Sequence, residues 1–279
     1  MPKNNCLGLY FKSVNMKRRT IFLFGSFLFI LFVSSSSEGI SQRLEAKTVT
    51  IDTNCNGFYQ YLPKDYNKHK KYPLLIFLHG VGELGNGSSD LPKVRRNGIL
   101  KMIQDGTFPD SFVVNGEEYR FIIFAPQFIH WPWPKTTQAI VDYAVKHYAV
   151  DKKRIYITGL SMGGGALWEC IGNSKKYGKK VAAVVPICGA SLADSIKAQT
   201  IARANVAVWA THNEGDRTVT VEFTHKYIRY INSAPVPPRE EARETIFSVQ
   251  GHDAWSKTYD PFFKENGLNV YEWMLSHHR

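Results

Sequence analysis

Short runs of consecutive apolar residues recur along the chain from residue 73 onward, with amphipathic segments between them. Runs that are apolar at successive positions are typical of strands buried on both faces. They lie at 73–78, 121–125, 155–158, 181–187, 205–210 and 245–249. Apolar residues at helical spacing occupy 91–103, 137–150, 219–231, 266–278 and the segment after residue 161. This alternation predicts an α/β fold: one doubly wound, mostly parallel sheet with helices on both faces.

Two further strands are expected ahead of the first buried run. The segments 48–52 and 57–62 alternate or are rich in aromatic residues, and a turn-rich connector follows them at Pro63. Together they predict an antiparallel pair at one edge of the sheet. No repeat and no Pro/Gly-rich break interrupts the chain beyond them. We therefore expect a single catalytic domain over 48–279, with the polar stretch 38–47 as a linker.

The N-terminal segment has the layout of a secretory signal peptide. Basic residues 17–19 precede an almost unbroken apolar run at 21–33, and small residues at 34–37 end it. The run is short for a membrane span, so residues 1–37 are predicted to be an N-terminal extension plus a cleaved signal peptide. Secretion or a periplasmic location, without stable membrane association after cleavage, is then expected. The alternative is an uncleaved signal anchor that keeps the protein attached to a membrane.

Composition and charge limit which kinds of partner the protein is expected to bind. With 44% hydrophobic and 13% aromatic residues the chain can bury a sizeable core. The formal net charge of +11 falls to +6 once the five Lys/Arg of residues 1–36 are removed, and the remaining basic residues are dispersed. No nucleic-acid partner is therefore expected. Cys55, Cys170 and Cys188 show no C-x-x-C spacing, which indicates no metal site; a single disulfide among them stays open.

The most informative stretch is Gly159-Leu-Ser161-Met-Gly163, which joins a buried strand to an apolar helical segment. A serine at the apex of so sharp a turn sits in strained backbone. A Cβ at either glycine would crowd that turn. The pattern predicts Ser161 as an exposed nucleophile.

Other polar residues follow the ends of predicted strands, as Ser161 does. They are His79, Gln127, Asp216 and His252. The carboxyl ends of parallel strands meet at one edge of a sheet, so we expect these side chains to lie close together. A serine nucleophile needs a base and an acid that supports the base, in the chain order Ser, acid, His. His252 is the predicted base and Asp216 the predicted acid.

Alternatives for these roles remain open at the level of sequence. Glu214 lies in the same loop and could replace Asp216, and Asp216 could instead cap the helix that starts near residue 219. Asp253 would have to fold back on its neighbour. His79 is expected to shape its own loop through side-chain hydrogen bonds, and His212 is the only other histidine worth testing.

An oxyanion needs donors already in place. One is expected to be the backbone N–H of Met162, at the start of the helix after Ser161, where the helix dipole favours negative charge. The other is expected from His79-Gly-Val81-Gly, most simply the N–H of Val81, because Gly80 and Gly82 let the backbone turn back toward Ser161.

These motifs, in this order, resemble the α/β-hydrolase superfamily, over about residues 48–279. The chain is most similar to a secreted esterase group that includes dienelactone-hydrolase-like, feruloyl-esterase-like and polyhydroxybutyrate-depolymerase-like proteins and bacterial proteins labelled "predicted peptidase" or phospholipase/carboxylesterase. The residues that carry the likeness are Leu78-His-Gly-Val-Gly-Glu83, Gly159-Leu-Ser-Met-Gly-Gly164, Ala125-Pro-Gln127, Asp216 and Gly251-His-Asp-Ala-Trp255. The resemblance implies a Ser161–Asp216–His252 triad and ester hydrolysis without a cofactor. The segment before Asp216 lacks the usual glycine after His212 and the usual acid before Asp216, which leaves Glu214 as a competitor.

The resemblance is loose on substrate. Gln127, Trp131 and Trp133 are candidate substrate-binding residues, with the two tryptophans as an aromatic wall for a sugar or phenolic ester, or as packing for a loop. The expected substrate is a small or polysaccharide-linked ester, with acyl groups on plant polysaccharide as the first candidate. A serine peptidase or lysophospholipase on the same fold is the alternative, and a catalytically silent binding protein is the alternative from another class.

Overall fold

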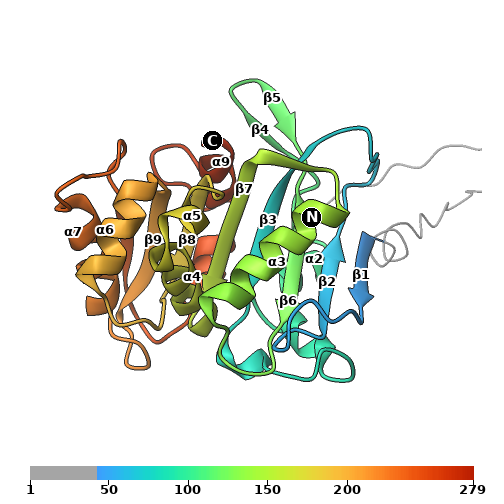
Figure 1. Cartoon of the computed structure of the whole chain (residues 1–279), viewed down its shortest axis with the longest axis horizontal. Coiled ribbons are helices and arrows are strands. Elements are labelled where there is room, and N and C mark those ends of the chain that lie inside the picture. Colours follow the sequence, from blue (N-terminus) through green and yellow to red (C-terminus); the bar gives the residue numbers. More distant parts are fainter. Residues whose placement is uncertain (1–42) are drawn as a thin grey trace, which may run out of the picture. The chain divides into compact units, whose positions relative to one another are not determined.

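The computed structural model describes residues 43–279, and an eight-stranded sheet runs through them (Figure 1). The strands are β1 (Leu44–Lys47), β2 (Gly57–Tyr61), β3 (Tyr72–Leu78), β6 (Ile122–Gln127), β7 (Val150–Leu160), β8 (Ala183–Ile187), β9 (Ala207–Gly215) and β10 (Arg243–Gln250). Their order is β1-β2-β6-β3-β7-β8-β9-β10, with β1, β2 and β6 paired antiparallel and all later pairs parallel. The predicted mostly parallel sheet, with an antiparallel pair at its edge, is confirmed.

Helices cover both faces of this sheet. One face packs against α3 (Pro134–His147), α4 (Met162–Asn173), α6 (Ser195–Ala204) and α7 (Glu222–Asn232), and the short α5 (Lys175–Gly178) adjoins α4 and α6. The other face packs against α2 (Gly98–Gln104), α8 (Trp255–Tyr259), α9 (Val270–Leu275) and the hairpin β4 (Phe112–Val114) to β5 (Glu117–Tyr119). Figure 1 shows α3 in front of the sheet and α2 behind it.

The central strands show why both faces are covered. In β3, Leu74 and Ile76 enter the core under α3 and α4, whereas Leu75 and Phe77 enter the core under α2 and α9. All four side chains are fully buried. Successive strand residues point to opposite faces, so a run without polar positions fits only a strand with helices on both sides.

The first strand differs from the prediction. The structure places β1 at Leu44–Lys47, inside the predicted linker 38–47, and leaves the predicted strand 48–52 irregular. The chain turns instead at this point, where the N–H of Ile51 donates to the carbonyl of Cys55. The predicted signal peptide 1–37 and the rest of the linker up to residue 42 lie outside the described residues.

Helix boundaries differ for local reasons. The helix expected over 91–103 is split into a 3-10 turn, η2 (Leu91–Arg95), and α2, because Gly98 adopts φ +63°. The helix α3 starts at Pro134, three residues before the predicted start at 137, because proline is favourable in a first turn; Trp133 takes the N-cap position. Near the C-terminus Asn266 and Gly267 have positive φ, so α9 begins only at Val270.

Three further features concern the helices, the cysteines and the C-terminal arginine. Within residues 43–279, no helix combines the length and apolar character that a membrane span requires. Cys55, Cys170 and Cys188 are each buried and unpaired, so the disulfide left open by the sequence is not formed. At the end of the chain, the Arg279 guanidinium donates to the carbonyls of Gly178, Val181, Ala204 and Asn205.

Candidate active site

Ser161 lies at the apex of the turn between β7 and α4. Its backbone has φ +53° and ψ −115°, a conformation that non-glycine residues rarely adopt. A Cβ on Gly159 would lie 2.6 Å from the carbonyl carbon of Gly163, and one on Gly163 would lie 2.1 Å from the carbonyl oxygen of Leu78. Both glycines are thus required by close backbone approach, the steric reason inferred from the sequence.

The structure brings Ser161, His252 and Asp216 into one hydrogen-bonded row. The Oγ of Ser161 lies 2.8 Å from Nε2 of His252, and Nδ1 of His252 lies 2.5 Å from Oδ2 of Asp216. Glu214 is exposed and takes no part, and Asp253 hydrogen-bonds to Ser256 instead. Each member of the row follows the carboxyl end of a strand: β7, β9 or β10.

The Asp216 carboxylate is fixed from several sides. Its Oδ1 accepts the N–H groups of Thr218 at 2.8 Å and Val219 at 3.0 Å. Burial by itself would raise the pKa of Asp216. The hydrogen bonds from His252, Val219 and Thr218 lower the pKa by more than burial raises it, so the pKa of Asp216 lies below its ordinary value. The carboxyl group is therefore ionised at neutral pH, as the acid of such a row must be.

His212 contributes to the same arrangement. It is buried; its Nε2 lies 3.0 Å from the Val219 carbonyl and 3.2 Å from Oδ2 of Asp216, and its Nδ1 lies 2.8 Å from the Thr224 hydroxyl. Burial lowers the pKa of His212, so the ring is neutral and donates from Nε2. The segment 211–215, interpreted from the sequence as a loop, continues strand β9 and buries this side chain.

The loop after β3 is held by two buried side chains. His79 accepts the Phe128 N–H at 3.0 Å on Nε2 and donates from Nδ1 to the Gly80 carbonyl at 2.7 Å, which agrees with the loop-shaping role expected of it. Gln127 is fully buried: it donates to the carbonyls of Glu83 and Asp90 and accepts the Gly87 N–H. All its amide groups are used within the fold, so the prediction that Gln127 binds substrate is wrong.

This held loop lies beside the serine. A Cβ on Gly80 would come within 3.8 Å of the Ser161 Cβ, and the short 3-10 turn η1 (Val81–Glu83) begins at the next residue. Val81 and Met162 each stand at the first position of a helical turn, where N–H groups have no partner within the turn. Among residues 43–279, no protein acceptor receives either N–H. Both donors predicted for an oxyanion are thus free.

Two neighbours of the row were not anticipated. The ligand-capable atoms of Cys188, Asp216 and His252 lie within 4.8 Å of one another, and burial raises the pKa of the Cys188 thiol to about 12. The thiol is therefore protonated and acts as a small apolar wall beside the imidazole. Trp255 packs edge-to-face on His252, with ring centroids 5.4 Å apart. In the sequence, only the closeness of Trp255 to His252 along the chain indicates that these two side chains are in contact.

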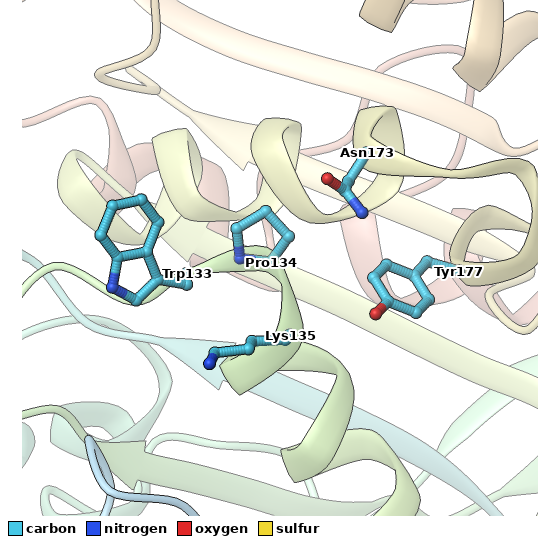
Figure 2. A pocket seen from close by; sticks show the side chains of 5 residues that line it. All are labelled: Trp133, Pro134, Lys135, Asn173 and Tyr177. Atoms are coloured by element: carbon cyan, nitrogen blue, oxygen red, sulfur yellow. The ribbon is translucent and has the colours of Figure 1, made fainter.

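Trp131 and Trp133 are both exposed, at 44% and 64% of their surface. Trp133 lines a surface groove together with Pro134, Lys135, Asn173 and Tyr177 (Figure 2). None of the residues that line it belongs to the Ser161–His252–Asp216 row. Both tryptophans thus expose much of their surface, and the groove at Trp133 is lined by residues other than those of the row.

The sequence over residues 53–256 matches the family model Esterase, described as "Putative esterase". The chain belongs to this esterase family. It is a carboxylic ester hydrolase, and it has the α/β-hydrolase fold that the resemblance implied. No curated protein matches the sequence.

Solved structures share the fold of this esterase at low sequence identity. A thermostable esterase has 24% identity and a TM-score of 0.61, over 86% of this chain and 64% of that one. The feruloyl esterase module from Clostridium thermocellum, a serine-to-alanine mutant complexed with sinapinate, has 16% identity and a TM-score of 0.54, over 78% and 86%. A protein from Bacteroides ovatus described as a "putative dipeptidyl aminopeptidase IV" has 13% identity and a TM-score of 0.52, over 76% of this chain and 33% of that one.

Proposed function

We propose that the protein hydrolyses esters through an acyl-enzyme intermediate, with Ser161 as nucleophile, His252 as general base and Asp216 as the supporting acid. The observation that carries this proposal is the row of hydrogen bonds from Ser161 Oγ through His252 to Asp216. A hydroxyl becomes nucleophilic when a base within hydrogen-bond reach takes its proton. The ionised Asp216 holds the imidazole in the tautomer that leaves Nε2 free to do so.

In the first half of the reaction, Ser161 Oγ attacks the ester carbonyl carbon and its proton passes to Nε2 of His252. The carbonyl oxygen becomes an oxyanion, which the N–H groups of Val81 and Met162 stabilise; each such donor contributes about 3 kcal/mol to lowering the barrier. When the tetrahedral intermediate collapses, the bond to the alcohol breaks and His252 returns the proton to the leaving oxygen. The alcohol departs and the acyl group stays on Ser161.

The second half repeats these steps with water. His252 takes a proton from the water molecule, whose oxygen attacks the acyl carbon. The second oxyanion occupies the same pair of donors. Collapse releases the carboxylic acid and returns the proton from His252 to Ser161, so that the enzyme is regenerated without a cofactor.

The test is hydrolysis of short-chain p-nitrophenyl esters. Ser161→Ala and His252→Ala should each lower kcat by roughly 10⁴-fold or more. Ser233→Ala and His69→Ala are matched controls in residues remote from the row, and should keep full activity. A fluorophosphonate probe should label Ser161 in the folded protein. Undiminished activity of Ser161→Ala would refute the proposal, and failure of the probe would favour the silent binding protein.

We further propose that the enzyme is secreted and removes acyl groups from plant polysaccharide. Secretion is supported by the basic, apolar and small-residue segments of residues 17–37. The substrate is supported by the fold shared with the feruloyl esterase module. Mass spectrometry of the exported protein tests the cleavage, and a screen of feruloyl, acetyl and lysophospholipid esters tests the substrate. Release from aminoacyl amides but not from esters would favour the peptidase instead.

A further inference from the structure

The groove at Trp133 lies between two helices on one face of the sheet. Trp133, Pro134 and Lys135 form the start of α3, and Asn173 and Tyr177 belong to the end of α4 and to α5. Figure 2 shows Trp133 and Tyr177 toward opposite ends of the groove, with Pro134 between them. Its volume is about 390 Å³, which falls within the roughly 300–1,000 Å³ typical of small-molecule sites.

The lining combines flat apolar surfaces with unused polar groups. The rings of Trp133, Pro134 and Tyr177 offer surfaces on which another ring can pack. Within the described part of the chain, Trp133 Nε1, the Lys135 ammonium, the Asn173 amide and the Tyr177 hydroxyl form no hydrogen bond with protein atoms. A sugar has the complementary chemistry, because the C–H face of its ring packs on aromatic groups while its hydroxyls need donors and acceptors at the rim.

The charge of the groove selects among sugars. Lys135 lines it, no acidic residue does, and exposed Lys175 and Lys176 directly precede Tyr177. A neutral sugar would gain nothing from this excess of positive charge. A sugar that carries a carboxylate, such as a uronic acid, would gain a charge-assisted hydrogen bond from the Lys135 ammonium.

The Asn173 end of the groove is too far from the serine to hold the ester itself. Ser161 precedes α4 and Asn173 ends it, and the 12 residues of this helix span about 18 Å at 1.5 Å per residue. A ligand at Asn173 would therefore belong to a part of a polymer several units away from the ester under attack. Binding there would raise the local concentration of polymer-linked esters around Ser161.

We propose that this groove is a non-catalytic binding site for a uronic-acid-containing polysaccharide chain. The inference rests on the proposed function for its purpose, since a polysaccharide site serves an enzyme that acts on acylated polysaccharide. The binding itself requires neither Ser161 nor catalysis. It can therefore be tested when hydrolysis is switched off.

The experiment uses the Ser161→Ala protein and native affinity electrophoresis in gels that contain polygalacturonate, unsubstituted xylan or no polymer. Polygalacturonate should retard the protein and neutral xylan should not. Adding Trp133→Ala should weaken the apparent Kd about tenfold or more, the loss expected when one stacked ring is removed. Adding Lys135→Gln should weaken it severalfold and flatten its dependence on salt concentration.

Two variants serve as matched controls for the loss of an exposed ring and of an exposed charge. Phe262→Ala removes a ring that is 90% exposed, and Lys152→Gln removes an exposed cation of β7; neither residue lines the groove. Both should bind as the parent does. Equal retardation by xylan, no retardation by either polymer, or a loss with Lys152→Gln equal to that with Lys135→Gln would each overturn the proposal. Any of these results would leave the ester assay of the wild-type enzyme unaffected.

Discussion

Acid should destabilise this fold through His79. The ring is fully buried, accepts the Phe128 N–H on Nε2 and donates from Nδ1 to the Gly80 carbonyl. Only the neutral ring can do both, because an imidazolium has no lone pair to accept with. Burial lowers the pKa of His79 from its ordinary 6.5 to about 4. The perturbation that tests this is His79→Gln, which keeps a donor and an acceptor but cannot titrate.

The sign and size of this loss of stability follow from the difference in the pKa of His79 between the folded and the unfolded chain. Between pH 6.5 and pH 4 the unfolded chain binds a proton at His79 that the folded chain refuses, so the free energy of unfolding falls as the pH falls through this window. Above pH 6.5 the neutral His79 makes its full contribution to the free energy of unfolding, and below pH 4 this contribution falls no further. Between pH 7.5 and pH 4.5 the free energy of unfolding falls by roughly 2–3 kcal/mol.

Urea unfolding at pH 7.5 and 4.5 measures this loss. His79→Gln should be less stable than the wild type at pH 7.5, yet its further loss of stability on acidification should be smaller by roughly 2–3 kcal/mol. Other titrating groups, such as Asp216 and His212, are present in both proteins and cancel in the comparison. An unchanged pH dependence in the variant, or an NMR titration of His79 near its ordinary pKa, would refute the reasoning.

Three further substitutions test other contacts. Gly163→Ala brings a Cβ to 2.1 Å from a backbone oxygen, so it should cost about 3 kcal/mol in thermal unfolding and abolish ester hydrolysis; normal activity would contradict the steric argument. Gln127→Ala removes the three hydrogen bonds of a fully buried side chain, so stability should fall by about 3 kcal/mol and kcat should fall with it, whereas Gln138→Ala, with a single side-chain hydrogen bond, should leave kcat unchanged. Arg279→Met removes four guanidinium-to-carbonyl contacts remote from the serine, so chemical unfolding should show a loss of about 3 kcal/mol at constant kcat; a drop in kcat would point to a coupling absent from the fold.

The sequence predicted the parallel strands and the row of Ser161, Asp216 and His252 because both depend on signals that are local or ordered along the chain. It predicted neither the position of the edge strand β1 nor the hairpin of β4 and β5. Consecutive apolar residues identify a buried strand, and a polar residue directly after it lies at the functional edge of a parallel sheet. Helix α6 was not predicted because five of its ten residues are alanine, threonine or serine, which leaves no strong apolar stripe, and Ile201 is its one large buried residue.

The direction in which a side chain points could not be predicted in the same way. Gln127 follows the rule for a functional strand end, yet it points inward and holds the loop of His79. His252 follows the same rule and lies beside Ser161 Oγ, so only the three-dimensional partners separate the two cases. Cys188 beside the imidazole belongs to this class, since nothing near it in the sequence indicates contact with a residue 64 positions away.

The two glycines around Ser161 have a consequence for how this enzyme can change. The Cβ position of Gly159 is occupied by the backbone of Gly163, and that of Gly163 by the backbone of Leu78, so no neighbouring side chain can be trimmed to make room. Substitutions of Gly159 or Gly163, even to alanine, should therefore hardly be tolerated. New substrate preferences have to arise in the exposed segments after β6 and β8, where Trp131, Leu192 and Ile196 already face solvent.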